Sequence, residues 1–247
     1  GYDAAHGLRA RGWRVFASCR KQADCDRLIA EGFDSPRIDY QDETTISAGL
    51  AEVLDATGGT LDALYNNGAF VSPGAVEDLP TDALREIFQA NFFGWHELTQ
   101  LAIKVMRKQG HGRIIQCSSV LGLVTMPYRG AYNSTKFALE GLTDTLRIEM
   151  RGTGIHIVLI EPGPVTSKLR INAQKRFERW IDWENSARAE QYIALRQRLY
   201  QAGPPDTWEL PAAAVTAKLI HALESPRPRA RYYVTMPTHL MGFLRRI

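Results

Sequence analysis

The chain has 247 residues, which is enough for one α/β domain with a sizeable core and short for two full domains. Its formal net charge is only +3 and its basic residues are dispersed, so we expect no nucleic-acid partner. Cys19, Cys25 and Cys117 match neither a disulfide framework nor a zinc-ligand pattern, which favours a reducing compartment and no metal site. With no signal peptide, and no apolar run near the ~20 residues of a membrane helix, the chain is expected in the cytoplasm.

Short apolar segments alternate with helical segments along the chain. The expected strands are 14–18, 61–65, 113–117, 155–160 and 231–235, with a weaker one at 37–39. The expected helices are 22–31, 44–56, 81–108, 131–151 and 211–224. This alternation predicts an α/β fold, a doubly wound parallel sheet in a single Rossmann-like domain over residues 1–247.

The segment at about 170–210 interrupts the alternation. It is polar and leans toward helix, with aromatic residues Phe177, Trp180, Trp183, Tyr192 and Tyr200 set into it. We expect a helical insertion over one end of the sheet, in the manner of a substrate lid. Its aromatic residues fit either an apolar substrate or the core of the insertion itself, and the sequence favours neither.

The first residues do not match the usual opening of a doubly wound sheet, which is a strand and a glycine-rich turn. Residues 1–10 have the pattern of a helix without the strand and turn that would precede it. We expect that the first strand and its loop are missing from this chain and that Gly1 is the last glycine of that loop. A native start in which the helix leads is the alternative. Because such a loop supplies backbone N–H groups for a pyrophosphate, the chain as it stands is expected to bind cofactor poorly, with two sheet edges left open.

The strongest motif is Tyr132-Asn-Ser-Thr-Lys136, which puts a tyrosine and a lysine on one helix face. A nearby ammonium favours the phenolate, so Tyr132 could exchange a proton with a carbonyl or alcohol oxygen. On its own the motif is weak, because a surface tyrosine and lysine often have this spacing by chance.

Two polar residues strengthen the motif. Ser119 follows the expected strand 113–117 and lies 13 residues before Tyr132, where its hydroxyl could hold a substrate oxygen. Asn91 lies in the expected helix 81–108, where asparagine could bend the helix or hold a water beside the lysine. The ordinary alternatives are a helix cap for Ser119 and a solvent-facing position for Asn91.

Two loops follow strands in positions that suit a ligand. Residues 66–69, Asn-Asn-Gly-Ala, follow the strand 61–65 and let a ligand approach the backbone. Residues 162–167, Pro-Gly-Pro-Val-Thr-Ser, follow the strand 155–160, where backbone groups could hold a carboxamide. The alternatives are an ordinary turn for residues 66–69 and a proline-rich loop at the end of a strand for residues 162–167.

In this order the motifs resemble the short-chain dehydrogenase/reductase family of single-domain NAD(P) oxidoreductases, over residues 1 to about 168. The family usually has Asn-Asn-Ala-Gly where this chain has Asn-Asn-Gly-Ala, which keeps two small residues. The resemblance implies a catalytic set of Asn91, Ser119, Tyr132 and Lys136, with Tyr132 and Lys136 also contacting the cofactor. It implies further cofactor contacts at Gly1, Asp39, Asn67, Gly68, Ala69, Pro162, Gly163, Val165 and Ser167.

The cofactor is expected to be NADP. Arg20 and Lys21 follow the strand 14–18, where NAD-binding folds carry an acid, and no acid occurs before Asp24. An arginine there can grip a 2′-phosphate with two hydrogen bonds. Two solvated charges at the start of a helix are the alternative.

The expected function is hydride transfer between NADP(H) and the carbonyl or alcohol carbon of a small, apolar substrate, with Tyr132 as acid/base. A homodimer is expected, because the helices at 81–108 and 131–151 resemble those the family uses for dimers. One alternative is a catalytically silent member that senses NADP or serves as a partner subunit. Another is a sugar-nucleotide epimerase or dehydratase, although those usually need more than the 80 residues that follow Ser167.

Overall fold

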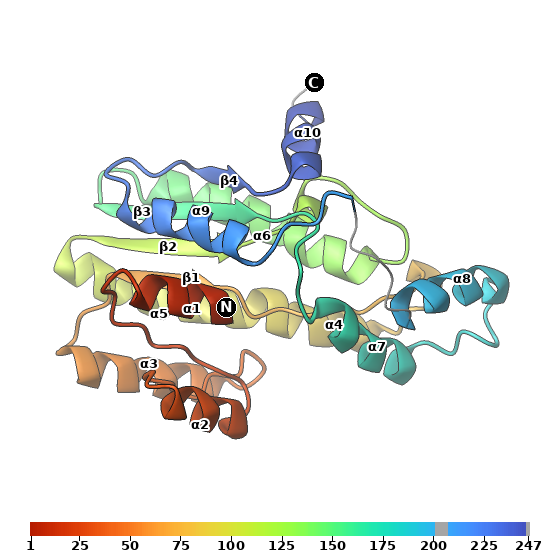
Figure 1. Ribbon diagram of the computed structural model, residues 1–247, viewed down its shortest axis with the longest axis horizontal. Coiled ribbons are helices and arrows are strands. Elements are labelled where there is room, and N and C mark those ends of the chain that lie inside the picture. Colours follow the sequence, from red (N-terminus) through yellow and green to blue (C-terminus); the bar gives the residue numbers. More distant parts are fainter. Residues whose placement is uncertain (201–206, 246–247) are drawn as a thin grey trace.

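The centre of the fold is a parallel sheet, shown in Figure 1. The computed structural model describes residues 1–200 and 207–245 of the chain. Within them the sheet has the strand order β1-β2-β3-β4, and every pair is parallel. The strands are β1 (Ala63–Asn66), β2 (Gly112–Cys117), β3 (Ile155–Glu161) and β4 (Arg231–Tyr233). The expected α/β class with a doubly wound parallel sheet is confirmed.

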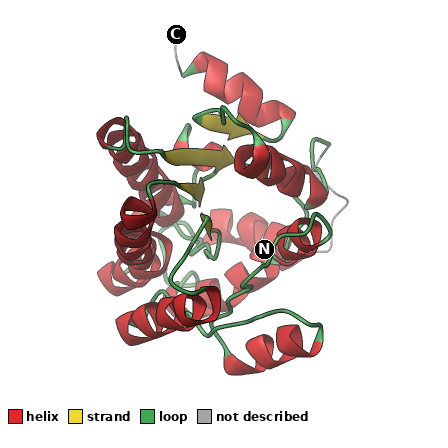
Figure 2. Cartoon of the chain, turned by 90° about the vertical axis from the view of Figure 1, so that its left-hand side faces the viewer, coloured by secondary structure: helices red, strands yellow, loops and turns green. Residues whose placement is uncertain are grey.

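Helices cover both faces of the sheet, as Figures 1 and 2 show. One face carries α1 (Tyr2–Arg9) and α9 (Ala213–Glu224), and the other carries α3 (Glu43–Thr57), α5 (Gly94–Gln109) and α6 (Gly130–Glu149). The alternation of side chains along each strand produces this arrangement. Ile115 and Val158 pack with α1 and α9, whereas their neighbours Ile114 and Ile157 pack with α5. Both faces of the central strands are therefore apolar, as in other buried parallel sheets.

The N-terminal expected strands do not join this sheet. Residues 14–19 form single parallel bridges, Phe16 with Asp34 and Cys19 with Arg37, beside helix α2 (Gln22–Ala30). In the described part of the chain β1 pairs only with β2, so its other edge is open. A cavity of about 960 Å³ lies between that edge and residues 14–19. The prediction of sheet strands at 14–18 and 37–39 was therefore wrong in detail. These segments form only single bridges, and among the described residues no strand connects them to β1.

The expected helix at 81–108 is divided by a wider turn. It consists of α4 (Thr81–Phe88), a π-helical turn (Gln89–Phe93) and α5. Such turns inside helices are often found at functional sites. Directly after the turn comes Gly94, where an added Cβ would lie only 2.6 Å from the Cβ of Tyr40. A glycine is therefore needed for the helix to approach the backbone of residue 40 so closely.

The insertion forms two helices, α7 (Leu169–Trp180) and α8 (Ala189–Tyr200), at the end of the sheet to which the strand arrows point in Figure 1. Its remaining expected part includes residues 201–206, which lie outside the described residues. Phe177 and Tyr192 are 1% and 0% exposed and belong to one apolar cluster, against which Trp180 and Trp183 pack. These four aromatic residues thus form a core between the insertion and the domain, which is the second of the two alternatives.

The C-terminal helix α10 (Met236–Leu244) packs beside the short turn after β2, where Arg245 Nη1 donates to the carbonyl oxygen of Gly122 at 2.9 Å. It leaves Leu240 and Phe243 exposed. Over residues 1–200 and 207–245, no helix combines the length and apolar character needed to cross a membrane. In the same ranges, no group of three or more His, Cys, Asp or Glu side chains is placed to hold a metal ion.

Gly94→Ala should lower the free energy of unfolding by about 1–3 kcal/mol, because the new methyl group overlaps the backbone of Tyr40. Gly141→Ala in α6 is the matched control, since nothing lies within 4 Å of its added Cβ. The control should be neutral or stabilising by up to ~1 kcal/mol, as expected for alanine in a helix. Urea unfolding of both variants measures the difference, and equal effects would contradict the close approach.

Candidate active site

Tyr132 and Lys136 come together at the carboxyl end of β2. Both lie on the inner face of α6, where they are 7% and 1% exposed. The Lys136 ammonium nitrogen is 5.5 Å from the centroid of the Tyr132 ring. The four-residue spacing therefore brings the two side chains to one place, as the sequence predicts, and neither is a surface residue.

Lys136 is held as a buried cation. Its Nζ donates to the carbonyl oxygen of Cys117, the last residue of β2, at 2.7 Å, and lies 4.4 Å from the centroid of the Trp95 ring. Burial lowers the pKa of Lys136 from 10.5 to about 8, against a smaller opposing effect of Cys117 and Glu140. The cation–π contact with Trp95 and the bond to the carbonyl oxygen fix where its charge lies.

Ser119 lies beside the Tyr132 phenol. Burial raises the pKa of Tyr132, and the neighbouring Ser119 hydroxyl acts in the opposite direction. The sequence argument expected the lysine to lower this pKa, but in the structure burial outweighs the other influences. Ser119 Oγ also accepts from the backbone N–H of Leu121 at 3.1 Å, so the residue caps a turn as well. The structure thus shows the capping role of Ser119, and its role in holding a substrate oxygen stays a prediction.

Asn91 is fully buried in the π-helical turn, so the solvent-facing alternative is wrong. Its Oδ1 accepts from the backbone N–H of Phe70 at 3.1 Å, and its Nδ2 donates to the Phe70 carbonyl oxygen at 2.9 Å. These two bonds tie the loop after β1 to the helix. Asn91 therefore contacts this loop, while Ser119, Tyr132 and Lys136 meet around the phenol.

Two buried residues escaped the sequence analysis. Trp95 Nε1 donates to the carbonyl oxygen of Gly68 at 2.9 Å, and its ring faces the Lys136 ammonium. Asn66 Nδ2 donates to Thr99 Oγ1 and Gln116 Oε1, both at 3.0 Å. The available signal for Trp95 was its position one helical turn after Asn91. The only signal for Asn66 was its place beside Asn67, which does not reveal that one amide points into the core.

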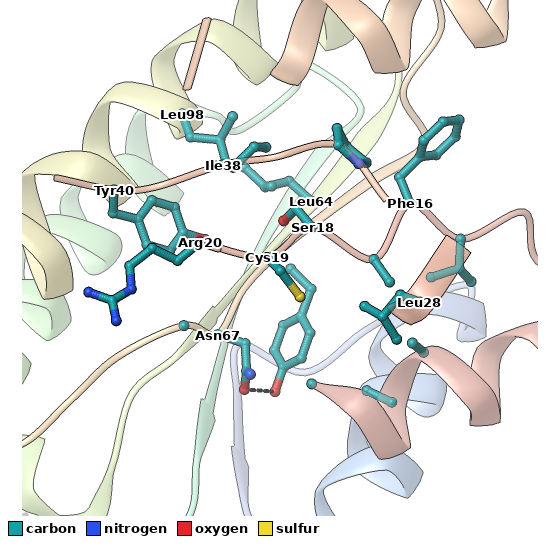
Figure 3. Close-up of a pocket in the computed structure, with 18 of the residues that line it drawn as sticks. Phe16, Ser18, Cys19, Arg20, Leu28, Ile38, Tyr40, Leu64, Asn67 and Leu98 are labelled. Atoms are coloured by element: carbon teal, nitrogen blue, oxygen red, sulfur yellow. Dashed lines mark hydrogen bonds between the residues drawn. The ribbon is translucent and has the colours of Figure 1, made fainter. Parts of the chain in front are cut away.

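Seven of the expected cofactor contacts line the cavity beside β1. Figure 3 shows Arg20, Cys19 and Asn67 around it, with the Tyr65 hydroxyl donating to Asn67 Oδ1 at 3.0 Å. The seven are Gly1, Arg20, Lys21, Asp39, Asn67, Gly68 and Ala69. Lys168 and Asn172 extend the lining toward the insertion. The cavity therefore runs from the N-terminal segments, along the open side of β1, to the insertion.

The loop after β3 lies outside that lining. Its expected contacts are Pro162, Gly163, Val165 and Ser167. The Pro162 carbonyl oxygen accepts from the backbone N–H of Val120 at 2.8 Å, and Val165 bridges to Leu210. An added Cβ on Gly163 would overlap the Thr235 hydroxyl. In this structure the backbone of the loop forms hydrogen bonds with other segments of the protein. Gly163 allows close packing against the residues at the start of α10.

Two buried carboxylates share one arginine, Arg231, which also pairs with the more exposed Asp144. Glu140 and Glu161 are 2% and 0% exposed, and Arg231 donates to both. Burial, followed by the charge of Glu140, raises the pKa of Glu161 from 4.5 to about 8. Because Glu140 follows Lys136 by one turn and Glu161 ends β3, this ion cluster links α6, β3 and β4.

Fold and site together define a Rossmann-type oxidoreductase with a tyrosine–lysine pair. The sequence profile of the short chain dehydrogenase family matches residues 1–177, and the chain belongs to that family. The chain is 35% identical over 248 residues to the "Uncharacterized oxidoreductase YbbO" of Escherichia coli K12, covering 100% of this chain and 86% of that protein.

A further relative and a solved structure of the same fold differ in the nicotinamide cofactor that they name. The NADPH-dependent 3-dehydrocapnine reductase of Ornithobacterium rhinotracheale is 29% identical over 240 residues, covering 94% of this chain and 82% of that protein. A crystal structure of a short chain dehydrogenase/reductase from Burkholderia phymatum in complex with NAD shares the fold with a TM-score of 0.80 and 21% identity. That likeness covers 100% of this chain and 87% of the other. The family resemblance found in the sequence is confirmed.

The stability of the protein should fall as the pH rises from about 4.5 to about 8, because Glu161 keeps its proton in the folded state over this window. The unfolded chain has lost that proton above its ordinary pKa, so the contribution is complete below the window and absent above it. Glu161→Gln should flatten the slope, while the exposed Glu184→Gln should not. Urea unfolding at several pH values measures both, and an unchanged slope in Glu161→Gln would contradict this assignment.

Proposed function

We propose that this protein transfers a hydride between NADP(H) and the carbonyl or alcohol carbon of a small substrate, with Tyr132 as acid/base. The meeting of Ser119, Tyr132 and Lys136 at the carboxyl end of β2 supports the proposal most directly. In parallel α/β sheets, ligands bind at this edge.

The residues that line the cavity fit a phosphorylated dinucleotide. Arg20 and Lys21 are exposed, and neither forms an ion pair with a carboxylate in the described part of the chain. Gly68 and Ala69 leave room for a ligand against the backbone after β1. When bound, the nicotinamide supplies the hydride, and Lys136 would hold its ribose.

The proton chemistry follows from the surroundings of the phenol. Because burial raises the pKa of Tyr132, its hydroxyl stays protonated at neutral pH and can donate to a carbonyl oxygen. The Lys136 ammonium, 5.5 Å from the ring, stabilises the phenolate that forms. The Ser119 hydroxyl holds the same substrate oxygen next to the phenol. In the oxidation of an alcohol the proton moves the opposite way.

The proposal includes a homodimer in the cytoplasm. Phe93 in the π-helical turn and Phe137 and Ile148 in α6 are 50%, 36% and 59% exposed. Apolar side chains of this size on the helices expected to pair would be covered by a second copy around a two-fold axis.

Tyr132→Phe should abolish turnover, with a loss of at least about 10²-fold, because no other group in the set can exchange the proton. The reaction is followed by absorbance of the reduced nicotinamide with a panel of aldehydes, ketones and alcohols. Tyr200→Phe removes an equivalent hydroxyl that bonds to Glu178, and it should keep full activity. Full activity in Tyr132→Phe would refute its role. Cofactor binding by the unaltered protein without turnover of any substrate would favour the silent family member.

Arg20→Asp should shift the preference from NADPH toward NADH by at least about tenfold in kcat/KM, because it replaces the partner of the 2′-phosphate by a repelling charge. Arg85→Asp in α4 is the control for a changed surface charge, and it should leave the preference unaltered. An unshifted preference in Arg20→Asp, or a native preference for NADH, would contradict the choice of NADP.

A further inference from the structure

Helix α7 carries a stripe of polar side chains along one face. Lys168 at its N-cap, Asn172 and Lys175 are spaced by four and three residues, which places them on the same side of the helix. The buried side chains of Ala173 and Phe177 lie on a different side and join an apolar cluster. All three polar residues are exposed and line the cavity beside β1. The polar stripe therefore faces the space in which the cofactor is expected.

Contacts next to the polar stripe fix the orientation of α7. Arg176, which also lines the cavity, pairs with Glu86 of α4, and its guanidinium carbon lies 4.2 Å from the centroid of the Phe70 ring. Trp180 Nε1 donates to the same carboxylate at 3.0 Å. Phe70 belongs to the loop after β1, which Asn91 holds by two hydrogen bonds to its backbone. The stripe cannot rotate away from the cavity without breaking these contacts to α4 and to the loop.

Within the described chain, the charge of the polar stripe is unpaired. In residues 1–200 and 207–245, no carboxylate forms an ion pair with Lys168 or Lys175. Arg176 and Arg179, on the same helix, both pair with Glu86. None of the residues that the insertion contributes to the cavity lining is acidic. Two cations on one helix face, next to a cavity and without a carboxylate partner, favour an anionic ligand there.

We infer that Lys168 and Lys175 bind the central diphosphate of the cofactor, so that α7 is part of the cofactor site. The inference rests on the proposed function and adds two binding residues to it. A lysine ammonium binds phosphate as a point charge at the end of a flexible stem. Residues that are seven positions apart lie about 10 Å from each other along a helix, a span that two long side chains can close around one diphosphate.

The distribution of charge around the cavity agrees with this assignment. NADP carries phosphate in two places, at the 2′-position and in the central diphosphate. The cavity likewise has cations in two places, with Arg20 and Lys21 after the segment 14–18 and Lys168 and Lys175 on the insertion. Gly1, at the start of α1, lines the same cavity, and the unpaired backbone N–H groups of a helix N-terminus also favour an anion.

Calorimetric binding of ADP-ribose tests the diphosphate site without turnover, because this probe has the diphosphate but neither the nicotinamide nor the 2′-phosphate. Lys168→Gln and Lys175→Gln should each weaken ADP-ribose at least about threefold, and the double variant at least about tenfold. Lys175→Arg keeps the charge and should retain most of the affinity. Lys104→Gln, an exposed lysine of α5 outside the cavity lining, is the control and should change nothing. An unaltered affinity in the double variant would overturn the inference.

The two nicotinamide cofactors distinguish the diphosphate from the 2′-phosphate. NADPH and NADH share the diphosphate, so the double variant at Lys168 and Lys175 should weaken both by the same factor. Arg20→Asp should instead weaken NADPH alone, because only NADPH carries the 2′-phosphate. Added salt should weaken the binding of both cofactors less steeply in the double lysine variant than in the unaltered protein. A loss confined to NADPH in the double variant would overturn the inference. A thermal melt of each variant checks that the fold is retained.

Turnover separates this inference from the proposed function. Reduction of a carbonyl substrate by NADPH, together with unaltered ADP-ribose binding in the double variant, refutes the diphosphate site while the oxidoreductase proposal stands. Lysine-dependent binding of ADP-ribose and NADPH, without turnover of any aldehyde, ketone or alcohol, supports the diphosphate site and counts against the oxidoreductase. Absence of ADP-ribose binding by the unaltered protein overturns the inference, whether or not turnover is seen.

Discussion

One buried ammonium holds the site together. Lys136 lies in α6, bonds to the carbonyl oxygen at the end of β2, and faces the ring of Trp95 in α5. Burying a cation is costly, and here a carbonyl dipole and an aromatic face reduce that cost. The same burial lowers the pKa of Lys136 and raises that of Tyr132, so both groups depend on one environment. Displacement of β2 or α5 would remove a partner of the Lys136 ammonium and would change the environment of the Tyr132 phenol at the same time.

A cluster of ion pairs lies one helical turn from Lys136. Arg231 on β4 joins Glu161 at the end of β3 and Glu140 in α6, one turn from the lysine. Two buried carboxylates with one cation cannot both ionise cheaply, which explains the raised pKa of Glu161. The cluster therefore links α6 to the strand ends through charge as well as through apolar packing.

The insertion contributes apolar packing around the phenol. Its aromatic residues fill the space around Tyr132, so they exclude water from the phenol.

The order and spacing of the motifs were enough to predict the fold class and the meeting of Tyr132 with Lys136, because helix and strand periods are local properties of the chain. Local pattern could not show that burial sets the pKa of Tyr132, that Gly163 serves packing against Thr235, or that residues 14–19 stand apart from the sheet. Nor could it reveal the amide network of Asn66 or the pairing of Arg231 with three carboxylates. Burial, partner choice and edge pairing depend on segments far apart in sequence, so only the tertiary structure decided them.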